Sequence, residues 1–121
     1  MKFNWEPGRQ GTGYEKLKLL NYWKFFSERK WDIYLLRYPV GSGIPRHKDP
    51  VPDHRHYRLN IYLWNAQAGG VPEHDGVIIS NRFFTLFRPD LFGHSVTPVT
   101  KGTRYVLSLG LVKRNTSFPS V

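Results

Sequence analysis

The chain has 121 residues, with 18 Lys and Arg against 9 Asp and Glu, and a net charge of +9 with the histidines neutral. Hydrophobic residues make up 40% and aromatic residues 16%, which excludes a disordered tail and favours a single folded domain over residues 1–121. Cysteine is absent, so disulfides, thiolate metal sites and a cysteine nucleophile are excluded, and a bound metal would need nitrogen and oxygen ligands.

The apolar runs and the first residues of the chain bear on its localisation, and the net charge does not by itself identify a function. No apolar run approaches the roughly 18 residues that span a bilayer, and the first residues lack the apolar core of a secretion signal. We therefore expect an intracellular, cytoplasmic protein with no membrane partner. The basic residues are dispersed along the chain, which is more typical of a solvated surface than of a nucleic-acid footprint.

The N-terminal quarter divides into an arm and a periodic segment. Residues 1–13 carry Gly or Pro at four positions and are interpreted as a loose arm. In residues 14–31, apolar side chains recur at i, i+3, i+4 and i+7, namely at Leu19, Tyr22, Trp23 and Phe26. This spacing predicts one amphipathic helix whose apolar face covers a sheet.

After Asp32 the helical period ends and short strand-like runs follow, separated by turns rich in Gly, Pro, Asn and Asp. The expected strands are 33–38, 57–64, 76–79, 82–87, 95–99 and 104–112. The sequence thus predicts a mainly β fold in which residues 32–112 form a small jelly-roll barrel and one N-terminal helix covers it.

Two short motifs carry candidate chemistry. In His47-Lys48-Asp49 an imidazole and a carboxylate are separated by one residue, so in an extended segment both point to one face and can bind one cation. Further on, His94 opens one expected strand and Arg104 opens the next, across a turn that contains Gly102. In an antiparallel hairpin these two positions can lie side by side, although Arg104 alone could equally be a surface residue on an edge strand.

Together, His47, Asp49 and His94 offer two imidazoles and one carboxylate, a set that suits non-haem Fe(II) with open coordination positions. Arg104 offers a planar fork for a carboxylate. With these residues in this order the sequence resembles the Fe(II)/2-oxoglutarate-dependent oxygenases. The matching segments are 37–43, 46–49, 60–65 with Gly69-Gly70, 87–89, 94–96 and 102–105.

The resemblance implies a double-stranded β-helix barrel with iron inside one open end. It implies that His47, Asp49 and His94 bind Fe(II) and that Arg104 anchors the cosubstrate 2-oxoglutarate. It also implies that O2 is used, with 2-oxoglutarate converted to succinate and CO2 while a substrate C–H bond is hydroxylated. The turn at 38–43 is most similar to the prolyl-hydroxylase branch, in which the tyrosine at the place of Tyr38 hydrogen-bonds the cosubstrate.

The alternation of side chains along the expected strands predicts which other residues face the cavity. If Arg104 points inward, so do Val106 and Ser108. Relatives often carry Ser or Thr where this chain has Val106, and Ser108 is our candidate for the missing cosubstrate contact. On the strand 57–64, Asn60, Tyr62 and Trp64 share one face, and we predict that Asn60 and Tyr62 point inward and line the cosubstrate site.

Three rival interpretations stay open. Asp53-His54-Arg55-His56 is a second ligand-like cluster, although its place between strands favours a role at the mouth of the site. His74 lies in a turn-like segment and is expected to be exposed to solvent. At the level of function, the alternatives are a non-catalytic basic β-barrel that binds nucleic acid and a cupin-type metal-binding protein.

The substrate is not specified by these motifs. The likeness to prolyl hydroxylases favours a protein side chain such as proline, whereas the positive charge would also suit nucleic acid, and small molecules are further candidates.

Overall fold

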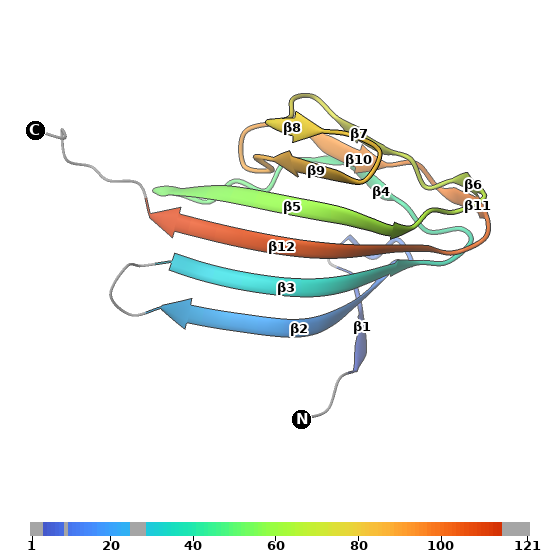
Figure 1. Cartoon of the computed structure of the whole chain (residues 1–121), viewed down its shortest axis with the longest axis horizontal. Coiled ribbons are helices and arrows are strands. Elements are labelled where there is room, and N and C mark those ends of the chain that lie inside the picture. The colour runs from blue at the N-terminus through green and yellow to red at the C-terminus, as the bar shows by residue number, and fades with distance from the viewer. Residues whose placement is uncertain (1–3, 9, 25–28, 115–121) are drawn as a thin grey trace, which may run out of the picture.

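A computed structural model describes residues 4–8, 10–24 and 29–114 of the chain, and within them it contains strands and no helix (Figure 1). The strands are β1 (Trp5–Pro7), β2 (Glu15–Lys24), β3 (Arg29–Tyr38), β4 (Ile44–His47), β5 (His54–Trp64), β6 (Ala68–Gly69), β7 (Pro72–His74), β8 (Ile79–Ser80), β9 (Phe84–Phe87), β10 (His94–Val96), β11 (Val99–Lys101) and β12 (Arg104–Arg114). No helix in this part of the chain could cross a membrane.

All the pairings are antiparallel. The large sheet has the order β1-β2-β3-β12-β5-β9-β8, and its four long strands β2, β3, β12 and β5 lie side by side in Figure 1. A three-stranded sheet, β4-β10-β7, and the pair β11-β6 complete the fold. The prediction of a mainly β, jelly-roll-like architecture is therefore confirmed at this level, but the described strands form open sheets and not a closed barrel.

The predicted helix over residues 14–31 is wrong. This segment supplies strand β2 and the start of β3, which pair along their length from Glu15↔Arg37 to Lys24↔Arg29. The ladder shifts between Lys18 and Leu20, so a bulge interrupts the period-two pattern that Lys16-Leu17-Lys18-Leu19 begins. Phe26 and the side chains of residues 20–29 lie outside what the structure describes, so the predicted packing of Tyr22, Trp23 and Phe26 is untested.

The other strand predictions hold for the long elements and for residues 82–87, which contain β9, and fail for two short segments. Residues 33–38, 57–64 and 104–112 fall within β3, β5 and β12, whereas 76–79 contributes only Ile79 to a strand. The segment 95–99 is divided between β10 and β11, which belong to different sheets. Pro98 lies at the division, and because proline has no amide hydrogen it cannot continue a ladder.

Alternation along β12 separates an inner from an outer face. Arg104, Val106 and Ser108 are buried, with 2%, 0% and 1% of their surface exposed, as the sequence predicted for one face. The core forms around Val106 and contains Tyr14, Tyr38 and Val99, and the rings of Tyr14 and Tyr38 stack with centroids 5.3 Å apart.

A bulge near the end of β5 changes the face of one predicted residue. Tyr62 pairs with Val106, but Trp64 pairs with Tyr105, so the register slips by one residue at Leu63. Trp64 consequently leaves the face of Asn60 and Tyr62, and lines a groove on the other side with Leu35, Leu63 and Tyr105. Asn60 and Tyr62, which precede the slip, keep the inward orientation that the sequence predicts.

Candidate active site

Two histidines face each other across the small sheet. His47 ends β4 and His94 begins β10, and they are register partners, with ring centroids 4.3 Å apart. Asp49 follows in the extended segment after β4, where its backbone amide donates to the carbonyl of Pro89 at 2.8 Å. Strand pairing and this backbone bond bring the three side chains together.

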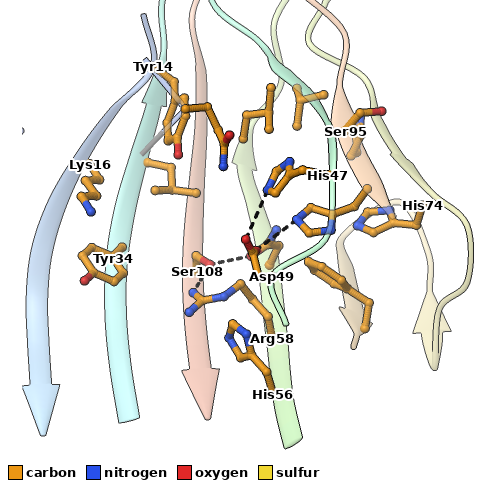
Figure 2. Close-up of a pocket in the computed structure, with 18 of the residues that line it drawn as sticks. Tyr14, Lys16, Tyr34, His47, Asp49, His56, Arg58, His74, Ser95 and Ser108 are labelled. Atoms are coloured by element: carbon orange, nitrogen blue, oxygen red, sulfur yellow. Dashed lines mark hydrogen bonds and ion pairs between the residues drawn. The ribbon is translucent and has the colours of Figure 1, made fainter. Parts of the chain in front are cut away.

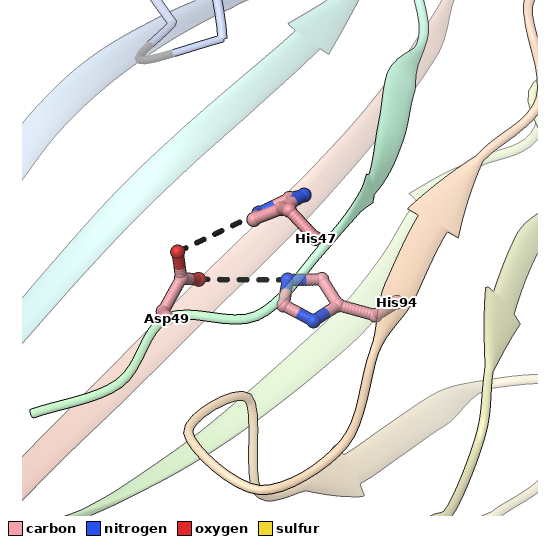
Figure 3. Close-up of side chains that lie close together, drawn as sticks. All are labelled: His47, Asp49 and His94. Atoms are coloured by element: carbon pink, nitrogen blue, oxygen red, sulfur yellow. Dashed lines mark ion pairs between the residues drawn. The ribbon is translucent and has the colours of Figure 1, made fainter.

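The three side chains form a set of potential metal ligands (Figure 3). Nε2 of His47 lies 3.6 Å from Oδ1 of Asp49, and Nε2 of His94 lies 3.5 Å from Oδ2. One ligand atom from each residue lies within 4.8 Å of the other two, and no other group of three or more His, Asp or Glu side chains does so in the described part of the chain. These distances are short enough for one metal ion to contact a ligand atom of each of the three residues.

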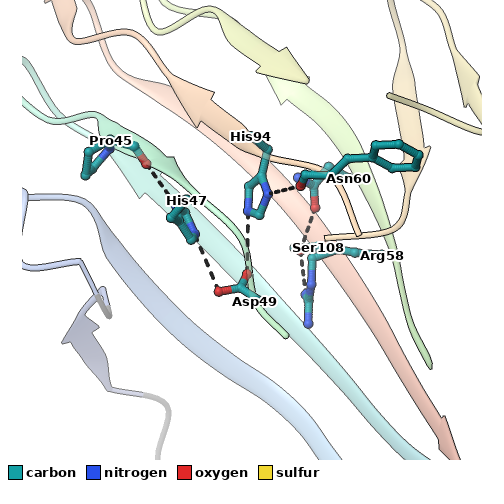
Figure 4. A network of polar contacts seen from close by, with 8 residues as sticks. Pro45, His47, Asp49, Arg58, Asn60, His94 and Ser108 are labelled. Carbon is teal, nitrogen blue, oxygen red and sulfur yellow. Dashed lines mark hydrogen bonds and ion pairs between the residues drawn. The ribbon is translucent and has the colours of Figure 1, made fainter. Parts of the chain in front are cut away.

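Backbone carbonyls orient both imidazoles (Figure 4). Nδ1 of His47 lies 2.7 Å from the carbonyl oxygen of Pro45, and Nδ1 of His94 lies 3.3 Å from that of Phe92. A carbonyl oxygen only accepts hydrogen bonds, so each Nδ1 carries a proton, and Nε2 is the ring nitrogen that is directed at Asp49 and can bind a metal. Metal-binding histidines need this arrangement, and the residues present fit a divalent cation such as Fe(II).

A third histidine lines the same cavity. The prediction that His74 is exposed to solvent is wrong, because β7 pairs with β10 and sets His74 opposite His94. Its ring packs edge-on against Phe87 with centroids 4.4 Å apart. Burial, helped by the electrostatic effect of the neighbouring His94 ring, lowers the pKa of His74 to about 4. The ring is therefore neutral near pH 7 and forms part of the wall behind His94.

Arg104 is a buried cation without a counter-ion. Its guanidinium lies over two aromatic rings, with Cζ 4.7 Å from the centroid of Tyr38 and 5.4 Å from that of Tyr62. Its Nε is buried without a hydrogen-bond partner, and no carboxylate of the described residues forms an ion pair with it. Burial lowers its pKa. An unpaired buried charge is costly, so this pocket suits an anion.

Aromatic side chains and a glycine pack closely against Arg104. Burial raises the pKa of Tyr38 to about 12 against the opposing effect of the Arg104 charge, so the phenol keeps its proton and can donate it. The hydroxyl of Tyr62 bonds to that of buried Thr85. Gly70 has φ +65, and a Cβ there would lie 3.3 Å from Cδ of Arg104 and 2.9 Å from Cγ2 of Val99. The Gly69-Gly70 pair thus lets the chain pass close to the arginine.

His94 and Arg104 meet in one cavity, but not as a hairpin. Strand β11 lies between them in the chain, and β10 and β12 belong to different sheets. A cavity of about 400 Å³ extends between the sheets and is lined by His47, Asp49, His94 and Arg104, among others. The predicted side-by-side hairpin placement is wrong, whereas the predicted convergence of these residues on one cavity is what the geometry shows.

Asn60 and Ser108 line the cavity and bond to each other. Ser108 Oγ donates to Asn60 Oδ1 at 2.6 Å and accepts from Arg58 Nη1 at 2.7 Å. Ser108 stands four residues beyond Arg104 on β12, which corresponds to about 13 Å along a strand. The predicted contact between Ser108 and the cosubstrate therefore remains untested, and its hydroxyl has two partners without it.

An ion pair that sequence reasoning missed crosses the cavity floor. Arg58 Nη2 donates to both carboxylate oxygens of Asp32, at 2.8 and 2.9 Å. Asp32 on β3 and Arg58 on β5 are both register partners of Gly110 on β12, so the pair bridges that strand where it has no side chain. The sequence carries a signal for Arg58. The alternation that places Asn60 and Tyr62 on the inner face of β5 also places Arg58 and His56 there.

The rival cluster does not form a ligand set. His56 is buried in the cavity wall, whereas His54 lies outside the cavity, with its Nδ1 2.8 Å from the carbonyl oxygen of Pro52. Asp53, His54 and His56 do not bring three ligand atoms together. This outcome leaves His47, Asp49 and His94 as the candidate metal centre of the described residues.

Comparisons with known proteins give a fold and no sequence family. No protein-family model matches the chain, and no curated protein sequence does. Among solved structures, the chain is similar to a viral collagen prolyl hydroxylase of Paramecium Bursaria Chlorella virus-1, solved as a 2OG complex. The TM-score is 0.57 at 15% identity, over 84% of this chain and 80% of that one. This likeness shows that the chain shares the fold of that prolyl hydroxylase.

A second solved structure, Rhodobacter sphaeroides SigE in complex with the anti-sigma ChrR, matches with a TM-score of 0.48 and 15% identity. The match covers 91% of this chain and 49% of that one.

Proposed function

We propose that the protein is an Fe(II)- and 2-oxoglutarate-dependent dioxygenase that hydroxylates a C–H bond of its substrate, with a protein side chain such as proline as the first candidate. The observation that carries this proposal is the position of Arg104, an unpaired buried guanidinium in the same cavity as His47, Asp49 and His94. A metal-binding protein without this chemistry has no need of a buried, unpaired cation beside its ligands.

The ligand set provides the first part of the mechanism. His47 and His94 present bare Nε2 atoms, because their Nδ1 protons are directed to backbone carbonyls, and Asp49 adds a carboxylate. Three protein ligands on one side of a metal leave positions for the cosubstrate and O2. Fe(II) held there would supply the redox chemistry that converts 2-oxoglutarate and O2 to succinate and CO2 while a C–H bond becomes C–OH.

The anion pocket provides the second part. Arg104 binds the far carboxylate of 2-oxoglutarate, which supplies the counter-ion that the buried guanidinium lacks in the protein. Tyr38, protonated because burial raises its pKa to about 12, donates a hydrogen bond to the same cosubstrate. The ring of Tyr62 lies over the guanidinium, and buried Val106 and Val99 keep water from this end of the cavity.

The likeness in fold to a collagen prolyl hydroxylase supports a protein side chain as the first substrate to test. The decisive assay follows succinate formed from 2-oxoglutarate by the purified chain with and without Fe(II). We expect iron-dependent succinate that His94→Ala abolishes, and a product heavier by one oxygen when a substrate peptide is present. Metal binding without any succinate would contradict the proposal and favour the cupin-type alternative.

A further inference from the structure

The cavity continues past the metal-binding group on the side away from Arg104. Along β12, Arg104 pairs with Tyr38, whereas Gly110 pairs with Arg58 and Val112 pairs with His56. Six residues of strand correspond to about 20 Å, so the backbones of Arg58 and His56 lie toward the opposite end of the cavity from Arg104, although the Arg58 guanidinium reaches back to Ser108. Figure 2 shows His56 beside Arg58, with Asp49 between them and His47.

His56 is the unexplained group at this end. Its side chain lines the cavity, only 8% of the residue is exposed, and neither Nδ1 nor Nε2 has a hydrogen-bond partner. Buried polar atoms without partners are rare in folded proteins because each costs free energy, so a partner that completes them is expected. Both ring nitrogens of one buried residue are left open here.

The charge at this end is already balanced. The guanidinium of Arg58 is held by both oxygens of Asp32 and by Ser108, so it lacks the unmatched charge that distinguishes Arg104. The lysines that line the cavity lie elsewhere. Lys16 pairs with Leu36 at the level of Val106, and Lys48 stands between two of the candidate metal ligands. Among the described residues that line the cavity, no unpaired cation lies beside His56.

The protonation state of His56 defines what it can bind. Burial, together with the nearby charge of Arg58, lowers its pKa to about 4. The ring is therefore neutral near pH 7 and offers one N–H donor and one bare nitrogen acceptor. A substrate segment that offers both a carbonyl acceptor and an N–H donor satisfies it, whereas carboxylates or phosphates, which only accept, leave one nitrogen open.

We propose that the end of the cavity formed by His56, Arg58 and Asp32 is a substrate subsite for a neutral amide, and that the substrate is a peptide. This inference rests on the proposed function, because it names the substrate class that the same cavity would bind. A nucleic acid is disfavoured because its phosphates require free cations, which the described lining of this end of the cavity lacks. In a peptide the amide next to the oxidised residue would occupy His56 while the reacting carbon lies near the metal-binding group.

The test uses three blocked proline probes on the metal-free full chain: acetylproline N-methylamide, its methyl ester and the free acid. Their dissociation constants, and the ¹⁵N shifts of the His56 ring, are followed by NMR. We expect the amide to bind roughly 5–10-fold more tightly than the ester, the difference of about one hydrogen bond, and to shift both His56 nitrogens. Equal binding of amide and ester, or tighter binding of the acid or of a short oligothymidylate, would overturn the proposal.

Substitutions of His56 test the amide subsite independently of the probes. His56→Leu should weaken amide binding by a similar factor, and His56→Gln, which restores one donor and one acceptor, should recover most of it. His54→Leu is the matched control, because His54 lies two residues earlier on β5 but outside the cavity. Amide binding unchanged in His56→Leu would overturn the subsite.

A parallel succinate assay with Fe(II) separates the two proposals. Amide binding through His56 without succinate formation would remove the oxygenase function and leave the amide subsite standing. Succinate formation without selective amide binding would do the reverse.

Discussion

Asp32 and Arg58 are not neighbours in the large sheet, yet they form an ion pair, because both stand opposite Gly110 on the strand that separates them. A Cβ at Gly110 would overlap Nη2 of Arg58 and lie 2.7 Å from Oδ2 of Asp32. The glycine is therefore required by the ion pair above it.

Gly110→Ala should displace the Arg58 guanidinium and lower the free energy of unfolding by about 1–3 kcal/mol, since it disrupts a half-buried, hydrogen-bonded pair. Urea denaturation measures this effect. Arg58→Met is the matched background, because it removes the nearest group that the new methyl meets and frees the Asp32 side chain to turn away from it. In that background Gly110→Ala should be neutral or stabilising, and an equal loss in both backgrounds would show that the ion pair is not the cause.

Removal of either imidazole of the candidate metal centre should abolish tight metal binding. His47→Ala or His94→Ala leaves two ligands in place of three, and we expect a loss of metal affinity greater than about 100-fold, beyond that of an outer-shell change. Anaerobic calorimetric titration with Fe(II) or Mn(II) measures it. His54→Ala, which alters the rival cluster, should leave the affinity unchanged; the opposite pattern would move the site to residues 53–56.

Arg104 should control cosubstrate affinity through its shape as well as its charge. Arg104→Ala should weaken 2-oxoglutarate binding by roughly 100-fold or more, because it removes the ion-pair partner in a desolvated pocket. Arg104→Lys keeps the charge and loses the planar fork, so we expect an intermediate loss of about tenfold. Titration of the Mn(II)-loaded variants provides the comparison. Wild-type affinity in Arg104→Ala would exclude Arg104 from the cosubstrate site.

His56 should make the fold sensitive to acid. Its pKa is about 4 in the folded protein and about 6.5 when unfolded, so the unfolded chain binds a proton more readily. Above pH 6.5 the residue has no effect on stability, and as the pH falls from 6.5 to 4 it destabilises the fold by up to roughly 3 kcal/mol. His56→Gln should remove this loss. Urea midpoints of the metal-free proteins at pH 7 and pH 4.5 test it, and parallel decreases in both proteins would refute it.

The sequence was informative where chemistry is local. His47 and Asp49 lie on one extended segment, and the alternation along β12 correctly separates Arg104, Val106 and Ser108 from the outer face. The grouping of His94 with them required the resemblance to the oxygenases, because β10 reaches β4 only through tertiary pairing.

Other features could not be predicted because pairing overrides local patterns. The spacing of Leu19, Tyr22, Trp23 and Phe26 matches a helix by coincidence, since a bulge after Lys18 breaks the strand period. His74 lies in a turn-like composition but is drawn into the cavity wall by its pairing with His94. The alternation along β5 places Arg58 on the inner face, but its pairing with Asp32 depends on three strands in register, which no single-strand pattern reveals.

The central claim is that His47, Asp49, His94 and Arg104 serve one metal and one cosubstrate. A crystal structure of the chain with Mn(II) and 2-oxoglutarate tests it most directly. We expect one metal about 2 Å from both Nε2 atoms and from the Asp49 carboxylate, with the far carboxylate of 2-oxoglutarate on the guanidinium of Arg104. A metal held at residues 53–56, or a cosubstrate that does not reach Arg104, would contradict it.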